Sequence, residues 1–367
     1  MIHCESNLIE KLKGENNIYI YGAGEIGHLL ERRLRCRNIV VSGFCVSDKS
    51  QIKREEVTID TLNECDFVIV AVGDELRDSL VRIAKEKKLR YDVLSNKAIT
   101  TMKCMDEKKI NFQIHVVEHC NLNCRGCYHF SPLAKAEFIN VEEFESDFNR
   151  MSVLFEGKAD QIVLLGGEPL LHPRINELMV IARQNFKNTK IQILTNGTLL
   201  LNMDDGFFCS LRENNIEIWV TKYPIDFDYD KAKEHALRVA DVKLNYFNEE
   251  PVRTLGHQPL DIKGSKNYKH NYYNCYRANI CTDLKHGKLF PCIIPAEIGP
   301  FNDYFKMNIT VTRDDYVDIY EAKSAEDILE SLDKPMPFCR FCDRENISEY
   351  GVMPWSVTKR KIEEWIE

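Results

Sequence analysis

The strongest constraint on this sequence is a group of three cysteines with the spacing Cys-x3-Cys-x2-Cys. They are Cys120, Cys124 and Cys127. The group follows residues 112–118, which we predict to form a strand. Three thiolates in one loop can bind three corners of an iron–sulfur cubane and leave its fourth iron open. A structural zinc site would require a fourth ligand, for which His119 and His129 are the adjacent candidates. The spacing therefore predicts a metal centre at the end of a strand.

Strands and helices alternate around this group. We predict strands at 112–118, 161–166, 190–195, 216–221 and 242–247, and helices at 141–155, 174–186, 203–213 and 229–238. Because this alternation is typical of parallel sheets covered by helices, it predicts an α/β fold with a partial β/α barrel over residues 111–270. In such barrels the chemistry lies at the carboxyl ends of the strands.

A smaller α/β segment at residues 1–100 precedes the barrel. We predict strands at 17–22, 39–45, 67–72 and 91–94, and helices ending near Arg35 and spanning 74–87. The loop after the first strand carries the pattern Gly-x-Gly-x-x-Gly, and an aspartate follows the second strand. Candidate nucleotide-binding residues are Gly22, Gly24, Gly27 and Asp48. The pattern indicates a small Rossmann-like domain that binds a nucleotide or nucleotide-sugar, or a loop that only packs the helix on the strand. Residues 101–110 are predicted to be a linker.

Two further motifs end the next two barrel strands. They are Gly166-Gly167-Glu168-Pro169 and Thr195-Asn196-Gly197. In this order, and with the cysteine triad, they resemble the radical S-adenosylmethionine (SAM) superfamily. The resemblance implies a four-iron, four-sulfur cluster on the triad, with SAM chelated by the open iron. It implies SAM contacts from Gly166, Gly167, Glu168, Pro169, Thr195 and Asn196.

One position departs from the pattern of that superfamily. Many members carry an aromatic residue immediately before the third cysteine, beside the adenine, and Gly126 stands there in this chain. Tyr128 is the candidate replacement, with Phe130 as an alternative.

A second set of cysteines lies in residues 271–345. Cys275 and Cys292 flank a hairpin signal at Gly287, and Cys339 and Cys342 form a Cys-x2-Cys pair. The arrangement resembles the SPASM extension in its shortened Twitch form. The resemblance implies a second, auxiliary four-iron, four-sulfur cluster that acts as an electron relay. Cys281 is an alternative ligand to Cys275, and a zinc ribbon is the competing interpretation. Residues 346–367 are predicted to be a tail, helical over 357–367.

The resemblance also implies a reaction. Reductive cleavage of SAM gives a 5′-deoxyadenosyl radical, which abstracts hydrogen from a substrate. The single extra cluster resembles the aminocyclitol alcohol dehydrogenases of the Twitch group. We therefore expect an oxidoreductase acting on a sugar, cyclitol or nucleotide-sugar. Epimerisation, peptide modification and a non-catalytic scaffold are the alternatives.

Side chains near the predicted strand ends could face the substrate. Lys222 and Tyr223 are the candidates for a general base, and Glu118 and His129 lie at other strand ends. Phe247 is predicted to be core.

Composition limits the partners. The net charge is −8 and no basic stripe is visible, which argues against nucleic-acid binding. No apolar stretch approaches the ~18 residues of a membrane helix, and no signal peptide is visible at the N-terminus. The sequence therefore predicts a cytoplasmic protein without a membrane partner, with a small-molecule substrate and an electron donor such as flavodoxin or ferredoxin.

Overall fold

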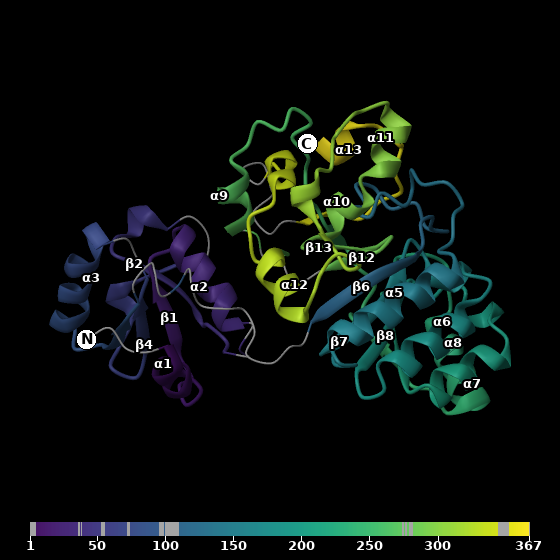
Figure 1. Ribbon diagram of the computed structural model, residues 1–367, viewed down its shortest axis with the longest axis horizontal. Helices are drawn as coiled ribbons and strands as arrows, with labels where there is room; N and C mark the ends of the chain where they lie inside the picture. Colours follow the sequence, from purple (N-terminus) through teal and green to yellow (C-terminus); the bar gives the residue numbers. More distant parts are fainter. Residues whose placement is uncertain are drawn as a thin grey trace. The chain divides into compact units, whose positions relative to one another are not determined.

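The computed structural model describes residues 5–35, 37, 39–52, 56–71, 74–94, 99, 110–273, 275, 277–278, 282–343 and 352–366. The chain divides into two compact units (Figure 1). The first consists of Met1–Glu107 and Tyr272–Cys275, and the second of Lys108–Asn271 and Tyr276–Glu367. Most of the predicted linker lies outside the described residues.

The first unit contains a parallel sheet with strand order β3-β2-β1-β4-β5. Its strands are β1 (Ile18–Tyr21), β2 (Gly43–Val46), β3 (Val57–Thr58), β4 (Phe67–Val70) and β5 (Arg90–Val93). Its helices are α1 (Glu5–Leu12), α2 (Glu25–Arg35) and α3 (Asp74–Glu86). Apolar residues of α1 and α2 pack on one face of the sheet and those of α3 on the other. The predicted small parallel sheet is confirmed, and α1 and β3 were not predicted.

The second unit contains a sheet with strand order β10-β9-β8-β7-β6-β12-β13-β14. Its strands are β6 (Asn111–Val117), β7 (Gln161–Gly166), β8 (Lys190–Thr195), β9 (Ile216–Val220), β10 (Leu244–Tyr246), β12 (Asp283–Lys285), β13 (Lys288–Phe290) and β14 (Val317–Asp318). The strands from β10 to β12 in this order are parallel, whereas β13 and β14 are antiparallel additions. The predicted hairpin is formed by β12 and β13, and Gly287 in its turn has a φ of 69°.

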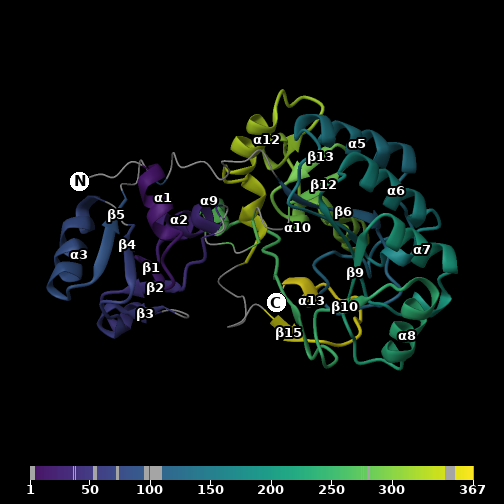
Figure 2. The same cartoon turned by 90° about the horizontal axis from the view of Figure 1, so that it is seen from below.

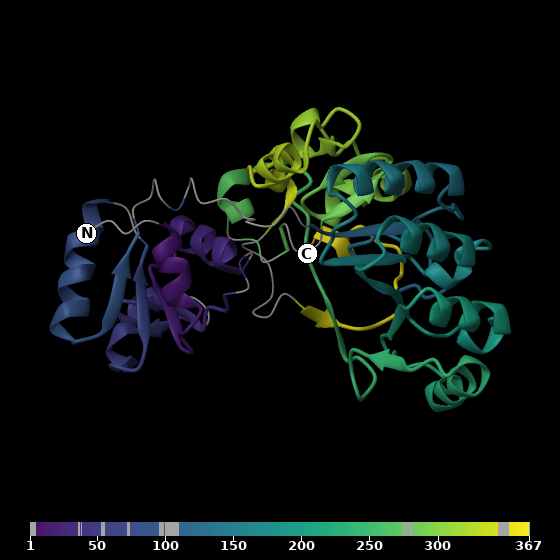
Figure 3. The ribbon, with the colours of Figure 1, turned by 60° about the horizontal axis from the view of Figure 1, so that its bottom comes forward.

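Four helices connect the parallel strands. They are α5 (Val141–Leu154), α6 (Ile175–Asn185), α7 (Asp205–Glu213) and α8 (Tyr229–Ala240). All four lie along the same face of the sheet (Figures 2 and 3). Strands buried against these helices are almost continuously apolar, as in β7, where Ile162 to Leu165 are all buried. The predicted α/β fold with a partial β/α barrel is confirmed.

The remaining elements follow β10. The helices are α9 (Tyr268–Tyr273), α10 (Ile293–Glu297), α11 (Gly299–Phe305), α12 (Ala325–Leu332) and α13 (Glu363–Ile366), and the 3₁₀ turn η6 spans Pro337–Phe341. Strand β15 (Val352–Pro354) pairs antiparallel with β11 (Thr254–Gly256). The helix predicted over 357–367 is therefore confined to α13. Before α13, Ser356 and Thr358 form backbone hydrogen bonds with Arg125 and Asn123 of the triad loop, and Lys359 N donates to Glu364 Oε1.

The register of the sheet places the three motifs at one edge. β6 pairs with β7, and β7 with β8, all in parallel, so their carboxyl ends meet. Val117 is the register partner of Gly166 at that end. The triad loop, the Gly-Gly-Glu-Pro turn and the Thr195-Asn196 segment therefore lie next to each other.

Candidate active site

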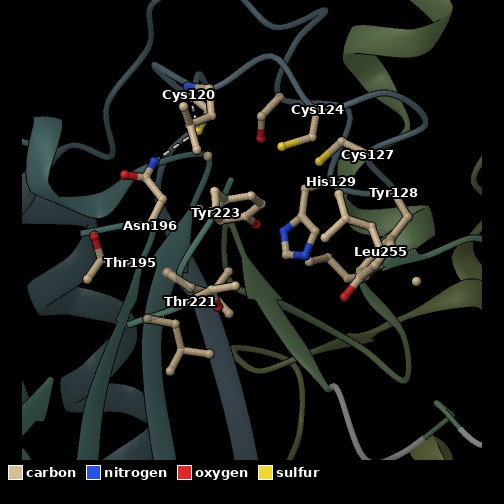
Figure 4. A pocket seen from close by; sticks show the side chains of 18 of the residues that line it. Cys120, Cys124, Cys127, Tyr128, His129, Thr195, Asn196, Thr221, Tyr223 and Leu255 are labelled. Atoms are coloured by element: carbon tan, nitrogen blue, oxygen red, sulfur yellow. Dashed lines mark hydrogen bonds between the residues drawn. The ribbon is translucent and has the colours of Figure 1, made fainter. Parts of the chain in front are cut away.

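A pocket of about 390 Å³ opens at this edge of the sheet, within the usual range of small-molecule sites. Figure 4 shows residues of the cysteine triad at its upper edge, with side chains from the ends of β8 and β9 beneath them. Its wall includes Cys120, Cys124, Cys127, Tyr128, Gly166, Gly167, Thr195, Asn196 and Tyr223. Most of the residues predicted to bind the cluster and SAM thus share one cavity.

The three cysteine side chains are largely withdrawn from water. Burial raises the pKa of all three thiols, and that of Cys127 to about 12. Thiols in this state do not ionise at neutral pH by themselves, so thiolates here need a cation beside them. Cys124 is buried and Cys120 and Cys127 are half-buried, and among the described residues the pocket wall includes no lysine or arginine. These sulfurs fit an iron–sulfur cluster, which would supply that charge.

Two glycines bring β7 against the triad loop. A Cβ atom on Gly167 would lie 2.0 Å from the carbonyl oxygen of His119, and Gly166 has a φ of 151°. Only glycine permits this approach of two backbones. Asn196 then reaches the same loop, because its amide donates to Asn121 Oδ1 at 2.8 Å and lies 3.7 Å from Cys120 Sγ.

Glu168 holds the ends of two strands together. Its carboxylate accepts hydrogen bonds from Thr195 Oγ1 at 2.6 Å, Asn196 N at 2.9 Å and Leu170 N at 3.0 Å. Burial raises the pKa of Glu168 to about 7, against the effect of these three donors. Its side chain is fully buried and does not form part of the pocket wall, and Pro169 begins a buried 3₁₀ turn beside it. The contacts of Glu168 thus fix Thr195 and Asn196, which do line the pocket.

The two predicted general bases lie in different surroundings. Tyr223 lines the pocket, and burial, followed by the neighbouring cysteines, raises its pKa well above the usual range. Its hydroxyl is therefore a hydrogen-bond donor at neutral pH. Lys222 is not part of the pocket wall: its ammonium donates to the carbonyl oxygen of Glu249 at 3.0 Å and lies over the ring of Tyr246.

Hydrogen-bonding side chains form another part of the pocket wall. They are Gln113, His129 and Ser131. Nδ1 of His129 lies 2.9 Å from Nε2 of His115, and Gln113 donates to Asp283 at 2.9 Å. Ser131 Oγ is buried and has no hydrogen-bond partner within the part of the chain that the structure describes. Gln113 and Ser131 were not predicted, since a lone glutamine in a strand and a lone serine in a loop carry no functional signal.

A buried network of charged side chains lies behind His129. Nδ1 of His115 is 3.4 Å from Glu297 Oε2, which Lys285 approaches at 2.6 Å. Lys285 also binds both oxygens of Glu118, at 2.9 and 3.0 Å. Burial lowers the pKa of His115 to about 3 and that of His129 well below its usual range, so both rings are neutral. Glu118 thus faces Lys285 and lines a different pocket from the cysteine triad.

Three aromatic residues near the pocket differ in exposure, and one of them departs from expectation. Phe130 is buried against Phe301, whereas Tyr128 lines the pocket beneath the guanidinium of Arg277, 4.1 Å from the ring centroid. Phe247, predicted to be core, is 56% exposed and lines the pocket, so that prediction was wrong. Its position just after the short strand β10 places it at the sheet edge.

The C-terminal cysteines are only partly described. Cys292 is buried and precedes α10, and Cys339 and Cys342 lie in and after η6. The side-chain amide of Asn271 donates to the backbone oxygens of both, at 2.8 and 2.7 Å, and so fixes the Cys-x2-Cys turn. Cys275 is half-buried and belongs to the first compact unit, and Cys281 lies outside the described residues. The auxiliary cluster remains a prediction.

Two glycines of the Gly-x-Gly-x-x-Gly segment in the first unit differ in the space available for a side chain. A Cβ atom on Gly27 would lie 1.9 Å from the carbonyl oxygen of Gly22, so Gly27 is needed for packing α2 on the loop. A Cβ atom on Gly24 would meet nothing within 4 Å. Asp48 caps a 3₁₀ turn and accepts from Ser50 N at 2.7 Å. Nucleotide binding by these residues remains a prediction.

Comparison with known proteins identifies the family of the central segment. Residues 114–248 match the model of the Radical SAM superfamily. The antilisterial bacteriocin subtilosin biosynthesis protein AlbA of Bacillus subtilis (strain 168) is 32% identical over 85 residues, 23% of this chain and 18% of that protein. The GTP 3′,8-cyclase of Campylobacter fetus subsp. fetus (strain 82-40) is 27% identical over 134 residues, 36% of this chain and 39% of that protein. The chain thus spans well under half the length of either relative.

A solved structure, BtrN in complex with AdoMet and 2-DOIA, aligns with a TM-score of 0.43 at 15% identity, over 68% of this chain and 100% of that chain. Within the part of the chain that the structure describes, no helix has the length and apolar character needed to cross a membrane.

Proposed function

We propose that this chain, which belongs to the radical SAM superfamily, oxidises an alcohol group of a small polar molecule such as a sugar, cyclitol or nucleotide-sugar. Membership of the family implies a four-iron, four-sulfur cluster and SAM as cofactors. The observation that carries the proposal is that the cysteine triad and three hydrogen-bonding side chains, Gln113, His129 and Ser131, line the same pocket.

The cofactors would supply a 5′-deoxyadenosyl radical, which takes a hydrogen atom from a substrate carbon. If that carbon carries a hydroxyl, loss of the hydroxyl proton and of one electron completes oxidation to the ketone. The proposed acceptor of the electron is the auxiliary cluster of Cys275, Cys292, Cys339 and Cys342. One electron from a donor such as flavodoxin or ferredoxin starts each cycle, so SAM is consumed once per product.

The buried network behind the pocket supports a hydroxyl as the bound group. A proton on Nδ1 of His115 is favoured, because that atom faces the Glu297 carboxylate at 3.4 Å. With the proton of neutral His115 on Nδ1, its Nε2 accepts and Nδ1 of His129 donates across their 2.9 Å contact. The remaining nitrogen of His129 then carries a lone pair. Such an acceptor suits a substrate hydroxyl and disfavours a carbonyl at the same place.

Polar groups beside His129 extend this recognition. The Oγ atom of Ser131 is buried and has no hydrogen-bond partner in the described part of the chain. Gln113 uses its side-chain nitrogen to donate to Asp283, so its amide oxygen is not engaged by that bond. Buried hydroxyl and amide groups cost free energy unless they are hydrogen-bonded. A substrate with several hydroxyl or amino groups would satisfy them, which favours a polyol over an apolar substrate.

A product analysis tests this proposal. The cluster-loaded protein, SAM and dithionite would be incubated without oxygen in deuterated water with myo-inositol, 2-deoxystreptamine, glucosamine and UDP-glucose as separate probes. A product two mass units lighter than the probe, with one 5′-deoxyadenosine per product, is expected for at least one of them. A product of unchanged oxidation state carrying one carbon-bound deuterium would identify an epimerase instead. The variant with alanine at all three triad cysteines is the matched control.

A further inference from the structure

The C-terminal strap, residues 352–366, lies against the cysteine triad loop. Its strand β15 pairs with β11, and its next residues run along the loop. Arg125 N donates to Ser356 O at 2.8 Å, and Thr358 N donates to Asn123 O at 2.8 Å. Trp365 Nε1 donates to the backbone oxygen of Cys127 at 2.9 Å. The strap is therefore bonded to the loop along most of its length.

The strap also packs against Gly126. Its φ is 59°, and a Cβ atom there would lie 2.7 Å from Glu364 O and 2.7 Å from Met353 Sδ. The strap therefore fills the space that a side chain at this position would need. This accounts for glycine immediately before the third cysteine, the position at which the sequence departs from its family.

One strap side chain reaches a cysteine sulfur directly. Trp355 Nε1 donates to Cys124 Sγ at 3.2 Å, and the Trp355 ring is half-buried. The ring centroid of Tyr223 lies 6.0 Å from that of Trp355. An indole N–H can only donate, so the bond supplies positive charge density to the sulfur.

We infer that Trp355 is a positioning residue that raises the reduction potential of the cluster on Cys120, Cys124 and Cys127. This inference rests on the assignment of the cluster to these cysteines. Reduction adds one negative charge, and a donor to a ligand sulfur stabilises the more negative state more strongly. Because SAM cleavage needs the reduced cluster, the strap makes this state easier to reach. The strap is thus part of the site and not a separate tail.

The chain offers a matched set of substitutions, because each of its three tryptophans donates its N–H to a different kind of acceptor. The acceptors are the Cys124 sulfur for Trp355, the Cys127 backbone oxygen for Trp365 and the Glu217 carboxylate for Trp219. Trp355→Phe removes the bond to sulfur and keeps an aromatic ring. Trp219→Phe removes an indole donor outside the pocket and serves as the control.

The test is an electron paramagnetic resonance (EPR) redox titration of the cluster-loaded full chain. The signal followed is that of the reduced cluster whose spectrum changes when SAM is added. We expect a more negative midpoint potential in Trp355→Phe, an unchanged one in Trp219→Phe, and wild-type iron content in both. Equal midpoints in wild type and Trp355→Phe would overturn the role of Trp355 and leave the cluster assignment intact. A wild-type protein without a SAM-responsive signal would overturn both.

Loss of the cluster in Trp355→Phe would call for a closer isostere. 3-Benzothienylalanine at position 355 keeps the fused rings and lacks the N–H donor. Its midpoint potential decides the question in that event: a negative shift supports the inference, and a wild-type value refutes it.

Discussion

Two glycine turns, one in each compact unit, follow parallel strands and exclude side chains for similar steric reasons. A Cβ atom on Gly27, in the first turn of α2, would lie 1.9 Å from the oxygen of Gly22, in the loop before this helix. A Cβ atom on Gly167 would lie 2.0 Å from the oxygen of His119, in the loop of the neighbouring strand. The first turn therefore stabilises a local strand–helix pair. The second joins two strand ends, and it is at such junctions that side chains from distant parts of the sequence form one site.

The largest effect is expected in the second unit, where the glycine turn and the triad loop form the site. Replacing Cys120, Cys124 and Cys127 together by alanine should remove about four irons and abolish 5′-deoxyadenosine formation, because no thiolate then holds the cluster. Iron analysis and chromatography of the reaction mixture measure both quantities. Cys209→Ala, a half-buried cysteine on α7 outside the pocket, is the control and should behave as wild type. Undiminished cleavage in the triple variant would refute the radical SAM assignment.

The same substitution in both turns sharpens the comparison. Gly167→Ala should displace the triad loop and strongly reduce cluster content and SAM cleavage, since the added Cβ meets backbone atoms that cannot rotate away. Gly27→Ala should destabilise the first unit by about 1–3 kcal/mol and leave SAM cleavage unchanged. Thermal unfolding and 5′-deoxyadenosine yield separate the two outcomes. Equal loss of cleavage in both variants would show that the turns do not differ in function.

A smaller effect is expected from the second group of cysteines. Alanine at Cys275, Cys292, Cys339 and Cys342 should lower the iron content from about eight to about four and leave 5′-deoxyadenosine formation intact. The reason is that a fully coordinated auxiliary cluster has no open iron for SAM. Iron and zinc analysis of the wild-type protein completes the experiment. About four irons with one zinc in the wild type would favour the zinc ribbon.

The last prediction concerns stability alone and involves Glu168, which joins the two strand ends. Its pKa is raised from 4.5 to about 7 in the folded chain, so between these values the folded state holds the proton more tightly. Stability should fall as pH rises through this window, by up to roughly 1.4 kcal/mol per pH unit. Glu168→Gln should flatten this dependence in thermal unfolding, and Glu213→Gln, on the exposed surface of α7, should not. An unchanged slope in Glu168→Gln would contradict the proposed linkage.

The sequence predicted those parts of the fold and site that depend on local pattern. The alternation of strand and helix patterns predicted the strands from β6 to β9 to within one residue at each end, and so placed the cysteine triad just after β6. It could not predict contacts between distant segments. Trp355 meets Cys124 across 231 positions, and nothing near either residue indicates this contact.

Predictions for short elements and single polar residues were weaker. The charged run at 357–367 has helix-forming residues, but its backbone bonds to the triad loop and only α13 remains helical. Ser131 and Gln113 looked like ordinary polar residues in a loop and a strand. Only the folded chain brings them to the same wall as His129.

The central claim is that the triad binds a cluster whose open iron binds SAM. The most direct measurement is the EPR spectrum of the dithionite-reduced protein with and without SAM, extended by electron–nuclear double resonance with SAM labelled with ¹⁵N at its amino group. We predict that SAM changes the spectrum and that a ¹⁵N coupling appears, both of which are lost in the triple-alanine variant. A spectrum that SAM leaves unchanged, without a nitrogen coupling, would contradict the claim.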